Sequence, residues 1–242
     1  RDKLVTGVQT CALPIWHKRM LEEKKDIAQS SIKRWIRESI KVKESLWNAP
    51  WMQGQIYEVA DCIAQALEKG NKVLVCGNGG SSSDAAHFCG ELNNQFSKKR
   101  VNSLPALDLS AMNATLTAIA NDSGYDFVFS KQVAGFAKPG DVVIGISTSG
   151  SSPNVLHALW RAKEVPAKTV LLTGKYKKEY VVSAVLMPSM DKIDKVTVEP
   201  DYVINVDSTL TPLIQETHIT ILHIIANLID SIMFGVDYLE DL

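Results

Sequence analysis

The chain has 242 residues, of which 45% are hydrophobic and 22% are charged, and its formal net charge at pH 7 is −1. This length and composition predict a soluble α/β protein with a substantial core, and the near-neutral charge gives no support to nucleic-acid binding. No apolar run approaches the roughly 18 residues of a membrane span, so we expect neither membrane insertion nor secretion and predict a cytoplasmic protein.

The first fifteen residues stand apart from the rest of the chain. Residues 5–15, VTGVQTCALPI, resemble the in-frame translation of a common sequencing-library adapter. We interpret residues 1–15 as an artefact, with a natural tail as the alternative, and exclude them from reasoning about the fold. One domain is then predicted over residues 16–242, with helices over residues 16–69 and the sheet core and last helix over residues 70–242.

The cysteines outside that segment are Cys62, Cys76 and Cys89. An odd number without paired spacing indicates neither a disulfide framework nor a cysteine-rich zinc site. This usage is typical of a reducing compartment, in agreement with the predicted cytoplasmic location.

Two helices are predicted before the first strand. Residues 16–47 are rich in Lys, Glu and Arg, and their apolar residues recur mostly at helical spacing (Met20, Ile27, Ile32, Trp35, Ile36 and Ile40). This pattern predicts a long amphipathic helix, and a second helix is predicted over residues 52–68, ended by Gly70. The apolar stripe either forms a helical subunit interface or packs on the sheet of its own chain.

The segment at residues 73–92, VLVCGNGGSSSDAAHFCGEL, is the most informative of the chain. An apolar strand over residues 72–76 leads into a glycine-rich turn, and a helix starts among the serines at 81–83. Hydroxyls and unpaired N–H groups at a helix N-terminus favour an anion, so the turn suits a phosphate. No Lys follows the glycines, which excludes the nucleotide-triphosphate loop.

The helix that follows carries His87 and Glu91, which are four residues apart and therefore share one face. Either side chain could bind a metal or move a proton. Such pairs are common on helix surfaces, so the interpretation needs support from elsewhere in the chain.

Strands and helices alternate through the rest of the chain. We expect strands over residues 104–109, 141–146, 168–172 and 202–206, and helices over 111–119, 125–136, 154–162 and 211–233. This order predicts an α/β fold, a doubly wound three-layer sandwich whose central parallel sheet binds ligands at the carboxyl ends of its strands. Residues 175–200 are interpreted as a long loop, with a lid or an oligomer contact as alternatives.

A second strand and serine turn at residues 142–152, VVIGISTSGSS, repeats the first. Its hydroxyls come from Ser147, Thr148, Ser149 and Ser152, and Pro153 suits the first turn of a helix. Hydroxyls and amides can bind a sugar phosphate without a large fixed positive charge. The repetition favours a phosphate site over a turn that merely changes direction.

Four segments in order, GNGGSSSDAAHFCGEL, AIANDSGYD, GDVVIGISTSGSS and IQETHITILH, resemble the sugar isomerase (SIS) domain family and its phosphoheptose isomerases. The resemblance implies a homotetramer with sites near subunit interfaces and one zinc ion per subunit. It implies zinc ligands at His87, Glu91, Gln215 and His223, and proton transfer by Glu91 and His223. The implied substrate contacts are Asn78, Gly79, Gly80, Ser81, Glu91, Asn121, Asp122, Ser147, Thr148, Ser149, Ser152 and Gln215.

The implied reaction converts sedoheptulose 7-phosphate to D-glycero-D-manno-heptose 7-phosphate for cell-surface heptose biosynthesis. An enediol route needs a base, a group for the oxygen-bound protons and stabilisation of the oxyanion. The alternatives are isomerisation of another phosphosugar, or a non-catalytic regulator resembling the DnaA initiator-associating protein, a group that typically lacks the equivalents of Glu91 and His223. Dinucleotide binding has the least support, since GNGGSS only approximates its motif.

Three residues depart from the isomerase pattern. Gln95 stands where the family often has Arg, Leu213 replaces an Arg, and Pro212 replaces an Asp, so bidentate contacts to a phosphate or hydroxyl are lost.

The spacing of two implied zinc ligands adds a geometric constraint. Gln215 and His223 are separated by about 12 Å along an ideal helix, which nearly exhausts their combined reach. Gln215 therefore either points along the helix axis or does not share the metal with His223. We interpret His218, three residues after Gln215, as a packed histidine or an outer partner of the site, with a substitute ligand as the alternative.

Overall fold

The computed structural model describes residues 15–175, 177, 179–184 and 194–239. Apart from Ile15, the adapter-like segment lies outside the described residues. The first helix, α1, covers Ile15–Trp47, and the chain divides into two compact units within it, Arg1–Lys41 and Val42–Leu242.

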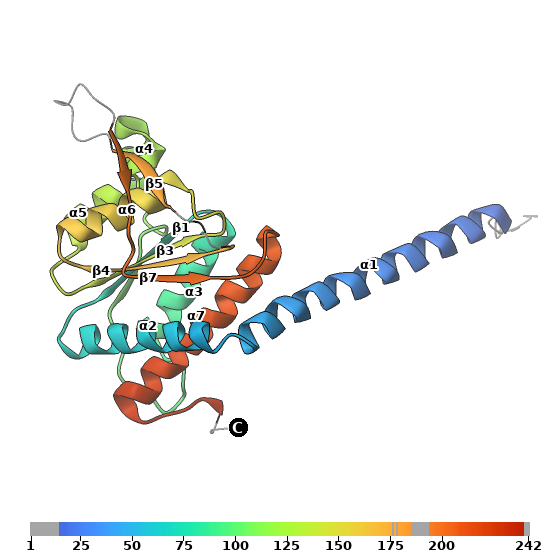
Figure 1. Ribbon diagram of the computed structural model, residues 1–242, viewed down its shortest axis with the longest axis horizontal. Helices are drawn as coiled ribbons and strands as arrows, with labels where there is room; N and C mark the ends of the chain where they lie inside the picture. Colours follow the sequence, from blue (N-terminus) through green and yellow to red (C-terminus); the bar gives the residue numbers. More distant parts are fainter. Residues whose placement is uncertain (1–14, 176, 178, 185–193, 240–242) are drawn as a thin grey trace, which may run out of the picture. The chain divides into compact units, whose positions relative to one another are not determined.

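The second unit is built on a sheet of five parallel strands in the order β2-β1-β3-β4-β7 (Figure 1). The strands are β1 (Val73–Gly77), β2 (Ala106–Asp108), β3 (Val142–Ser147), β4 (Lys168–Thr173) and β7 (Tyr202–Asn205). Both β1 and β3 are buried along their whole length, which explains their nearly continuous apolar sequence. The predicted parallel sheet is confirmed.

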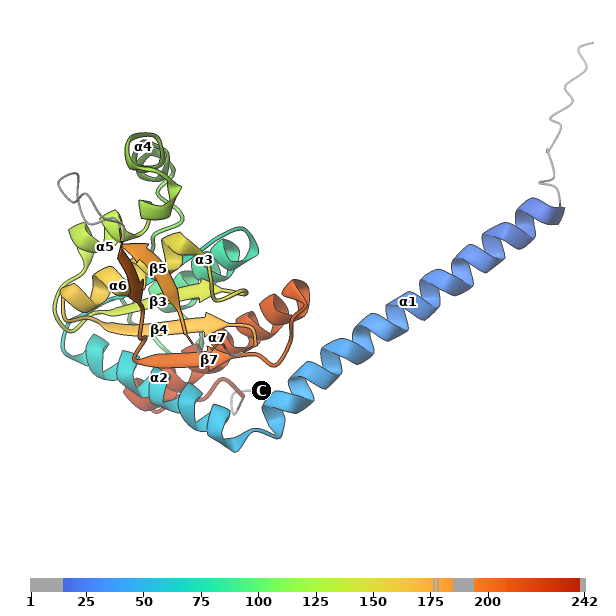
Figure 2. The same cartoon turned by 45° about the horizontal axis from the view of Figure 1, so that its top comes forward.

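Helices cover both faces of this sheet. Figures 1 and 2 show α2 (Pro50–Glu68) and α7 (Thr211–Phe234) on one side, and α5 (Ser130–Phe136) and α6 (Pro153–Glu164) on the other. Side chains of β1 alternate between two cores: Val73 and Val75 join α2, α7 and α3 (Gly80–Asn93), whereas Leu74 and Cys76 join α5 and α6. The predicted three-layer sandwich is therefore confirmed.

Two segments differ from the prediction. The helix expected over residues 125–136 is divided into a 3₁₀ turn, η1 (Tyr125–Phe127), and α5, while α4 (Asn113–Ser123) precedes both. Gly124, at φ +98°, ends α4 and turns the chain in a conformation that other residues rarely adopt.

The segment from 175 to 200 is more than a loop. Strands β5 (Val181–Ala184) and β6 (Asp194–Thr197) pair antiparallel, and Tyr180, Val182 and Val198 pack into the second core. The residues between the two strands, 185–193, lie outside the described residues. The local sequence pattern did not predict this hairpin, because the two paired strands are separated by a long connection.

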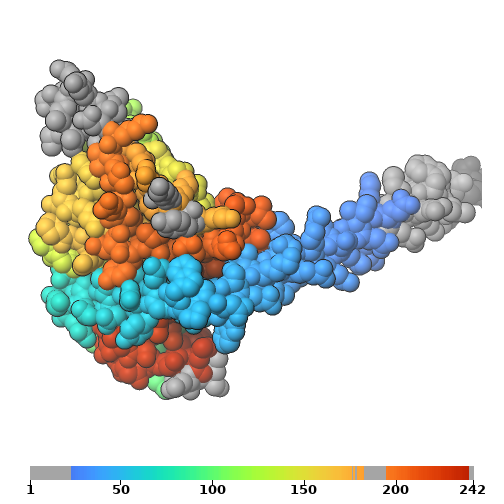
Figure 3. Space-filling view, viewed as in Figure 1, coloured from blue at the N-terminus to red at the C-terminus, as the bar shows by residue number. Residues whose placement is uncertain are grey.

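Helix α7 is long and apolar enough to cross a membrane by length and composition alone. Its residues Leu222, Ile225 and Ile229 are instead buried in the first core. Figure 3 shows α7 beside α2 on the face drawn, and the two helices pack together. The apolar composition is explained by this packing, as in the core helix of a soluble protein.

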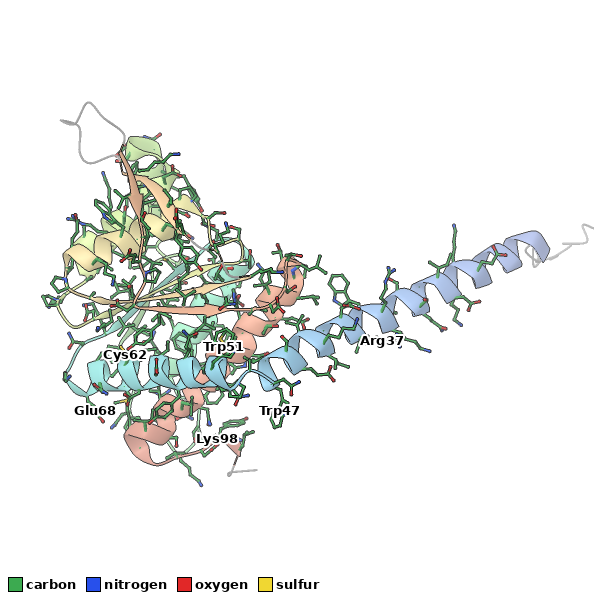
Figure 4. The ribbon with its side chains drawn as sticks, in the orientation of Figure 1. Arg37, Trp47, Trp51, Cys62, Glu68 and Lys98 are labelled. Carbon is green, nitrogen blue, oxygen red and sulfur yellow. The ribbon has the colours of Figure 1, made fainter. Side chains whose placement is uncertain are left out.

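Apolar side chains on α1 are exposed. Within residues 23–41, the side chains of Ile27, Ile32, Trp35, Ile36 and Ile40 are each at least 50% exposed. Where α1 leads into α2, Trp47 and Trp51 are also exposed (Figure 4). The residues of the predicted apolar stripe are thus exposed.

Candidate active site

The first glycine turn lies at the carboxyl end of β1. A Cβ at Gly77 would lie 2.5 Å from the Ser81 carbonyl oxygen, so only glycine fits there, and Gly79 adopts φ +55°. The Ser81 N–H donates to the Asn78 carbonyl oxygen at 3.0 Å, and the Ser82 N–H donates to that of Gly79 at 3.0 Å. The turn is therefore tightly closed against the N-terminus of α3.

The second serine turn follows β3, the strand next to β1, so both turns lie at the same edge of the sheet. Ser147 Oγ donates to Ser152 Oγ at 2.9 Å, and Ser151 Oγ donates to Ser149 Oγ at 2.9 Å. Ser149 is exposed and Thr148 is half-buried. Hydroxyls of the second turn are thus joined in two pairs, Ser147 with Ser152 and Ser149 with Ser151.

A reciprocal amide pair joins the two turns. Asn78 Nδ2 donates to Asn154 Oδ1 at 2.9 Å, and Asn154 Nδ2 donates to Asn78 Oδ1 at 2.8 Å. The Tyr125 hydroxyl from η1 also donates to Asn78 Oδ1, at 3.1 Å. Sequence reasoning missed Asn154 and Tyr125, although both belong to or adjoin the quoted motifs, because their partner lies on a distant segment.

Three predicted metal ligands converge between α3 and α7. His87 Nε2 lies 2.9 Å from Glu91 Oε1, and His223 Nε2 lies 3.2 Å from His87 Nε2. Their ligand atoms all lie within 4.8 Å of one another. Two imidazoles and one carboxylate are a donor set that catalytic zinc sites use, with a coordination position left for water or substrate. The residues present therefore fit a zinc ion.

The surroundings of His223 favour its neutral imidazole. Burial lowers the pKa of His223, and the neighbouring His87 lowers it further, while Glu91 opposes both. One turn before His87, burial raises the pKa of Asp84 to about 6, and the charge of His87 counteracts this shift. Asp84 Oδ2 is buried, and no hydrogen-bond partner for it occurs among the described residues. Asp84 is not among the residues singled out from the sequence.

Gln215 lies near the start of α7 and contacts the first turn. Its carboxamide lies directly against Gly80, where a Cβ would collide with it, at the start of α3. His87 lies seven residues further along α3, which is about 10 Å of helix rise. The structure therefore places Gln215 at the first turn, and its sharing of a metal with the cluster stays a prediction.

His218 is a buried histidine with a structural partner. It is 0% exposed, and its Nε2 lies 3.0 Å from the carbonyl oxygen of Thr173 at the end of β4. A carbonyl only accepts, so Nε2 carries the proton. Burial lowers the pKa of His218 to about 4, which keeps the ring neutral. The interpretation as a packed histidine agrees with this position.

Known proteins share both the sequence and the fold. A SIS domain family model matches residues 35–174. The chain is 42% identical to the phosphoheptose isomerase of Thermodesulfovibrio yellowstonii, over 86% of this chain and 94% of that protein. It is 45% identical to the probable phosphoheptose isomerase of Thermoplasma acidophilum, over 73% of this chain and 87% of that protein. This chain belongs to the SIS domain family, among the phosphoheptose isomerases.

Solved structures agree with that assignment. Phosphoheptose isomerase GmhA from Neisseria gonorrhoeae is 35% identical, with a TM-score of 0.71 over 84% of this chain and 99% of that one. A phosphoheptose isomerase from Francisella tularensis is 32% identical, also with a TM-score of 0.71, over 84% and 98% of the two chains.

The three residues of this SIS domain that depart from the family pattern lie in different surroundings. Leu213 is buried in the first core and Pro212 occupies the first turn of α7, a position that suits proline. Gln95 is exposed beyond the end of α3. Asn121 Nδ2 donates to Asp122 Oδ1 at 2.8 Å, and both residues are exposed. Among the described residues, no hydrogen bond joins Asn121 or Asp122 to the serine turns.

Proposed function

We propose that this SIS domain protein is an aldose-ketose isomerase that converts sedoheptulose 7-phosphate to D-glycero-D-manno-heptose 7-phosphate, a step toward cell-surface heptose. The observation that carries the proposal is the convergence of His87 and Glu91, on the helix that follows a phosphate-type turn, with His223 on α7. Relatives named phosphoheptose isomerase, at 42% identity and over most of both chains, support the same assignment.

The serine turns are assigned to the phosphate. Ser81 at the N-terminus of α3 and the hydroxyls of Ser147, Thr148, Ser149 and Ser152 supply donors, and the positive ends of the α3 and α6 helix dipoles favour an anion. The remaining substrate contacts are assigned to the sugar chain or turn backbone, namely Asn78, Gly79, Gly80, Asn121, Asp122 and Gln215. Binding of this kind uses hydroxyls and amides, so it tolerates the loss of Arg at positions 95 and 213.

Glu91 and His223 are assigned to proton transfer. Glu91 takes the proton from C1 of the ketose while O2 gains a proton, which gives the enediol; Glu91 then returns a proton to C2 as O1 loses one. His223 moves the proton between the two oxygens. Glu91 Oε1 faces His87, and its second oxygen is available for the carbon-bound proton.

Zinc is the proposed cofactor. His87, Glu91 and His223 would hold it, with Gln215 as the proposed fourth ligand. When bound, the ion would polarise the carbonyl and stabilise the charge that develops on the enediol oxygens.

A substrate panel with and without added zinc tests this function. The protein should isomerise sedoheptulose 7-phosphate, lose turnover after chelation and regain it with zinc. If only a different phosphosugar were turned over, that sugar would replace sedoheptulose 7-phosphate as the proposed substrate. No turnover of any phosphosugar, together with binding to a replication initiator, would favour the regulator instead.

The proposed assembly is a homotetramer in the cytoplasm, with its sites near subunit interfaces. Exposed apolar residues on α1, among them Trp35 and Ile36, supply a surface for helix-helix association. The free cysteines of the described residues, of which Cys76 and Cys89 are buried, suit a reducing compartment.

Sedimentation tests the assembly. We expect the parent protein to sediment as a tetramer and a Trp35→Glu, Ile36→Glu variant to dissociate, because two charges would face an apolar interface. A Lys33→Glu, Arg34→Glu variant on the same helix controls for added charge. A monomeric parent protein would contradict the proposal.

A further inference from the structure

The end of α3, which carries Glu91, is held by a buried arginine. The Arg100 side chain is 0% exposed, and its Nη1 donates to the Leu92 carbonyl oxygen at 2.8 Å, while its Nη2 donates to the carbonyl oxygen of Glu91 itself. Carbonyls in the last turn of a helix have no intrahelical partner. One planar guanidinium thus donates to two of them next to the proposed base, and the Leu92 carbonyl oxygen also accepts the Leu104 N–H at 2.9 Å.

Arg100 is tied in turn to the helix that carries His223. Its Nε lies 2.9 Å from Asp230 Oδ1, and the Asp230 side chain is also 0% exposed. Asp230 Oδ2 accepts the Ser97 N–H at 2.9 Å. Burial raises the pKa of Asp230, and the Ser97 amide and Arg100 counteract the rise. Asp230 lies seven residues after His223, on the same face of α7.

We propose that Arg100 and Asp230 are positioning residues that fix Glu91 against His87 and His223. This inference rests on the proposed roles of Glu91 and His223. Neither Arg100 nor Asp230 touches the reacting atoms: the pair acts by locking the last turn of α3 to α7.

The pair is better explained by geometry than by stability. Two buried charges lose their hydration, so replacing such a pair by apolar residues is often neutral or stabilising. Its position between the two helices that share the cluster accounts for its presence. A displacement of about 1 Å at a reacting group can reduce a rate on the order of 100-fold.

Arg100→Lys tests the proposal, because lysine keeps the charge but cannot hold two carbonyls and a carboxylate at once. We expect kcat to fall roughly 10- to 100-fold, with KM and the stoichiometry of inorganic phosphate binding unchanged, since both phosphate turns lie at the other end of α3. Hydrogen exchange should become faster at the amides of residues 91–94 and remain the same at 83–87. Asp230→Asn keeps the shape of the side chain, so it should lower kcat and speed up exchange at residues 91–94 by smaller factors than Arg100→Lys.

Asp141→Asn is the matched control. Asp141 is buried and accepts hydrogen bonds from the Lys72 and Lys138 N–H groups, at 3.0 and 2.7 Å, at the amino ends of β1 and β3. This variant should lose stability with kcat unchanged. The proposal would be overturned if Arg100→Lys lost turnover and phosphate-binding stoichiometry by the same fraction, because the variant would then be partly unfolded. It would also be overturned if kcat and the amide hydrogen exchange at residues 91–94 were unchanged, or if neither Arg100→Lys nor Asp230→Asn folded.

Failure of the proposed function is recognised separately. A parent protein without isomerase activity, or an active Glu91→Gln variant, would remove the chemistry assigned to Glu91. The exchange rates at residues 91–94 would still show whether the pair orders the end of α3.

Discussion

Glu91→Gln should abolish isomerisation of sedoheptulose 7-phosphate and leave a folded protein. An amide cannot take up the carbon-bound proton, and a positioned general base typically contributes 10²- to 10⁴-fold to a rate, so we expect kcat to fall at least about 10³-fold. The Glu91 side chain is 23% exposed, and Gln matches its size, so the fold should be retained. Turnover is measured together with the thermal unfolding curve.

The control for this substitution is Glu164→Gln. Glu164 also lies on a helix and forms an ion pair within one turn, with Arg161, and its side chain is 38% exposed. The same chemical change there should leave kcat unaffected. A Glu91→Gln enzyme with kcat within tenfold of the parent value would remove Glu91 from proton transfer, whatever happens to its metal content.

The parts of the fold that the sequence predicted are those in which local pattern and tertiary position coincide. The apolar strands β1 and β3 are buried on both faces, so composition alone indicates a parallel sheet. Each serine turn directly follows its strand, and both are therefore placed at one sheet edge without any knowledge of packing.

The parts that the sequence could not predict depend on contacts between distant segments. Asn154 and Tyr125 belong to the site because each reaches Asn78 across the sheet edge. Arg100 and Asp230 are separated by 130 positions, and a charged residue in a polar stretch such as SKKR is ordinarily expected on the surface. Only the packing of α3 against α7 gives these residues a role near Glu91 and His223.

His223→Asn should remove both turnover and bound zinc. Asparagine is shorter than histidine and has no imidazole, so Nε2, which now lies 3.2 Å from His87 Nε2, is lost from the cluster. We expect kcat to fall on the order of 10²- to 10⁴-fold, the range of a lost acid-base group. Zinc content should drop well below the one ion per subunit expected for the parent, and excess zinc should not restore activity, because the variant also lacks the group that moves the oxygen-bound proton.

Ile224→Asn is the control for placing asparagine on this helix. Ile224 is the next residue of α7 and is 38% exposed, so the substitution adds the same side chain one position away from the cluster. It should retain zinc and turnover. Loss of turnover with full zinc content in His223→Asn would mean that this histidine moves protons without holding the metal, whereas restoration by zinc would mean the reverse. Full activity in His223→Asn would contradict both roles.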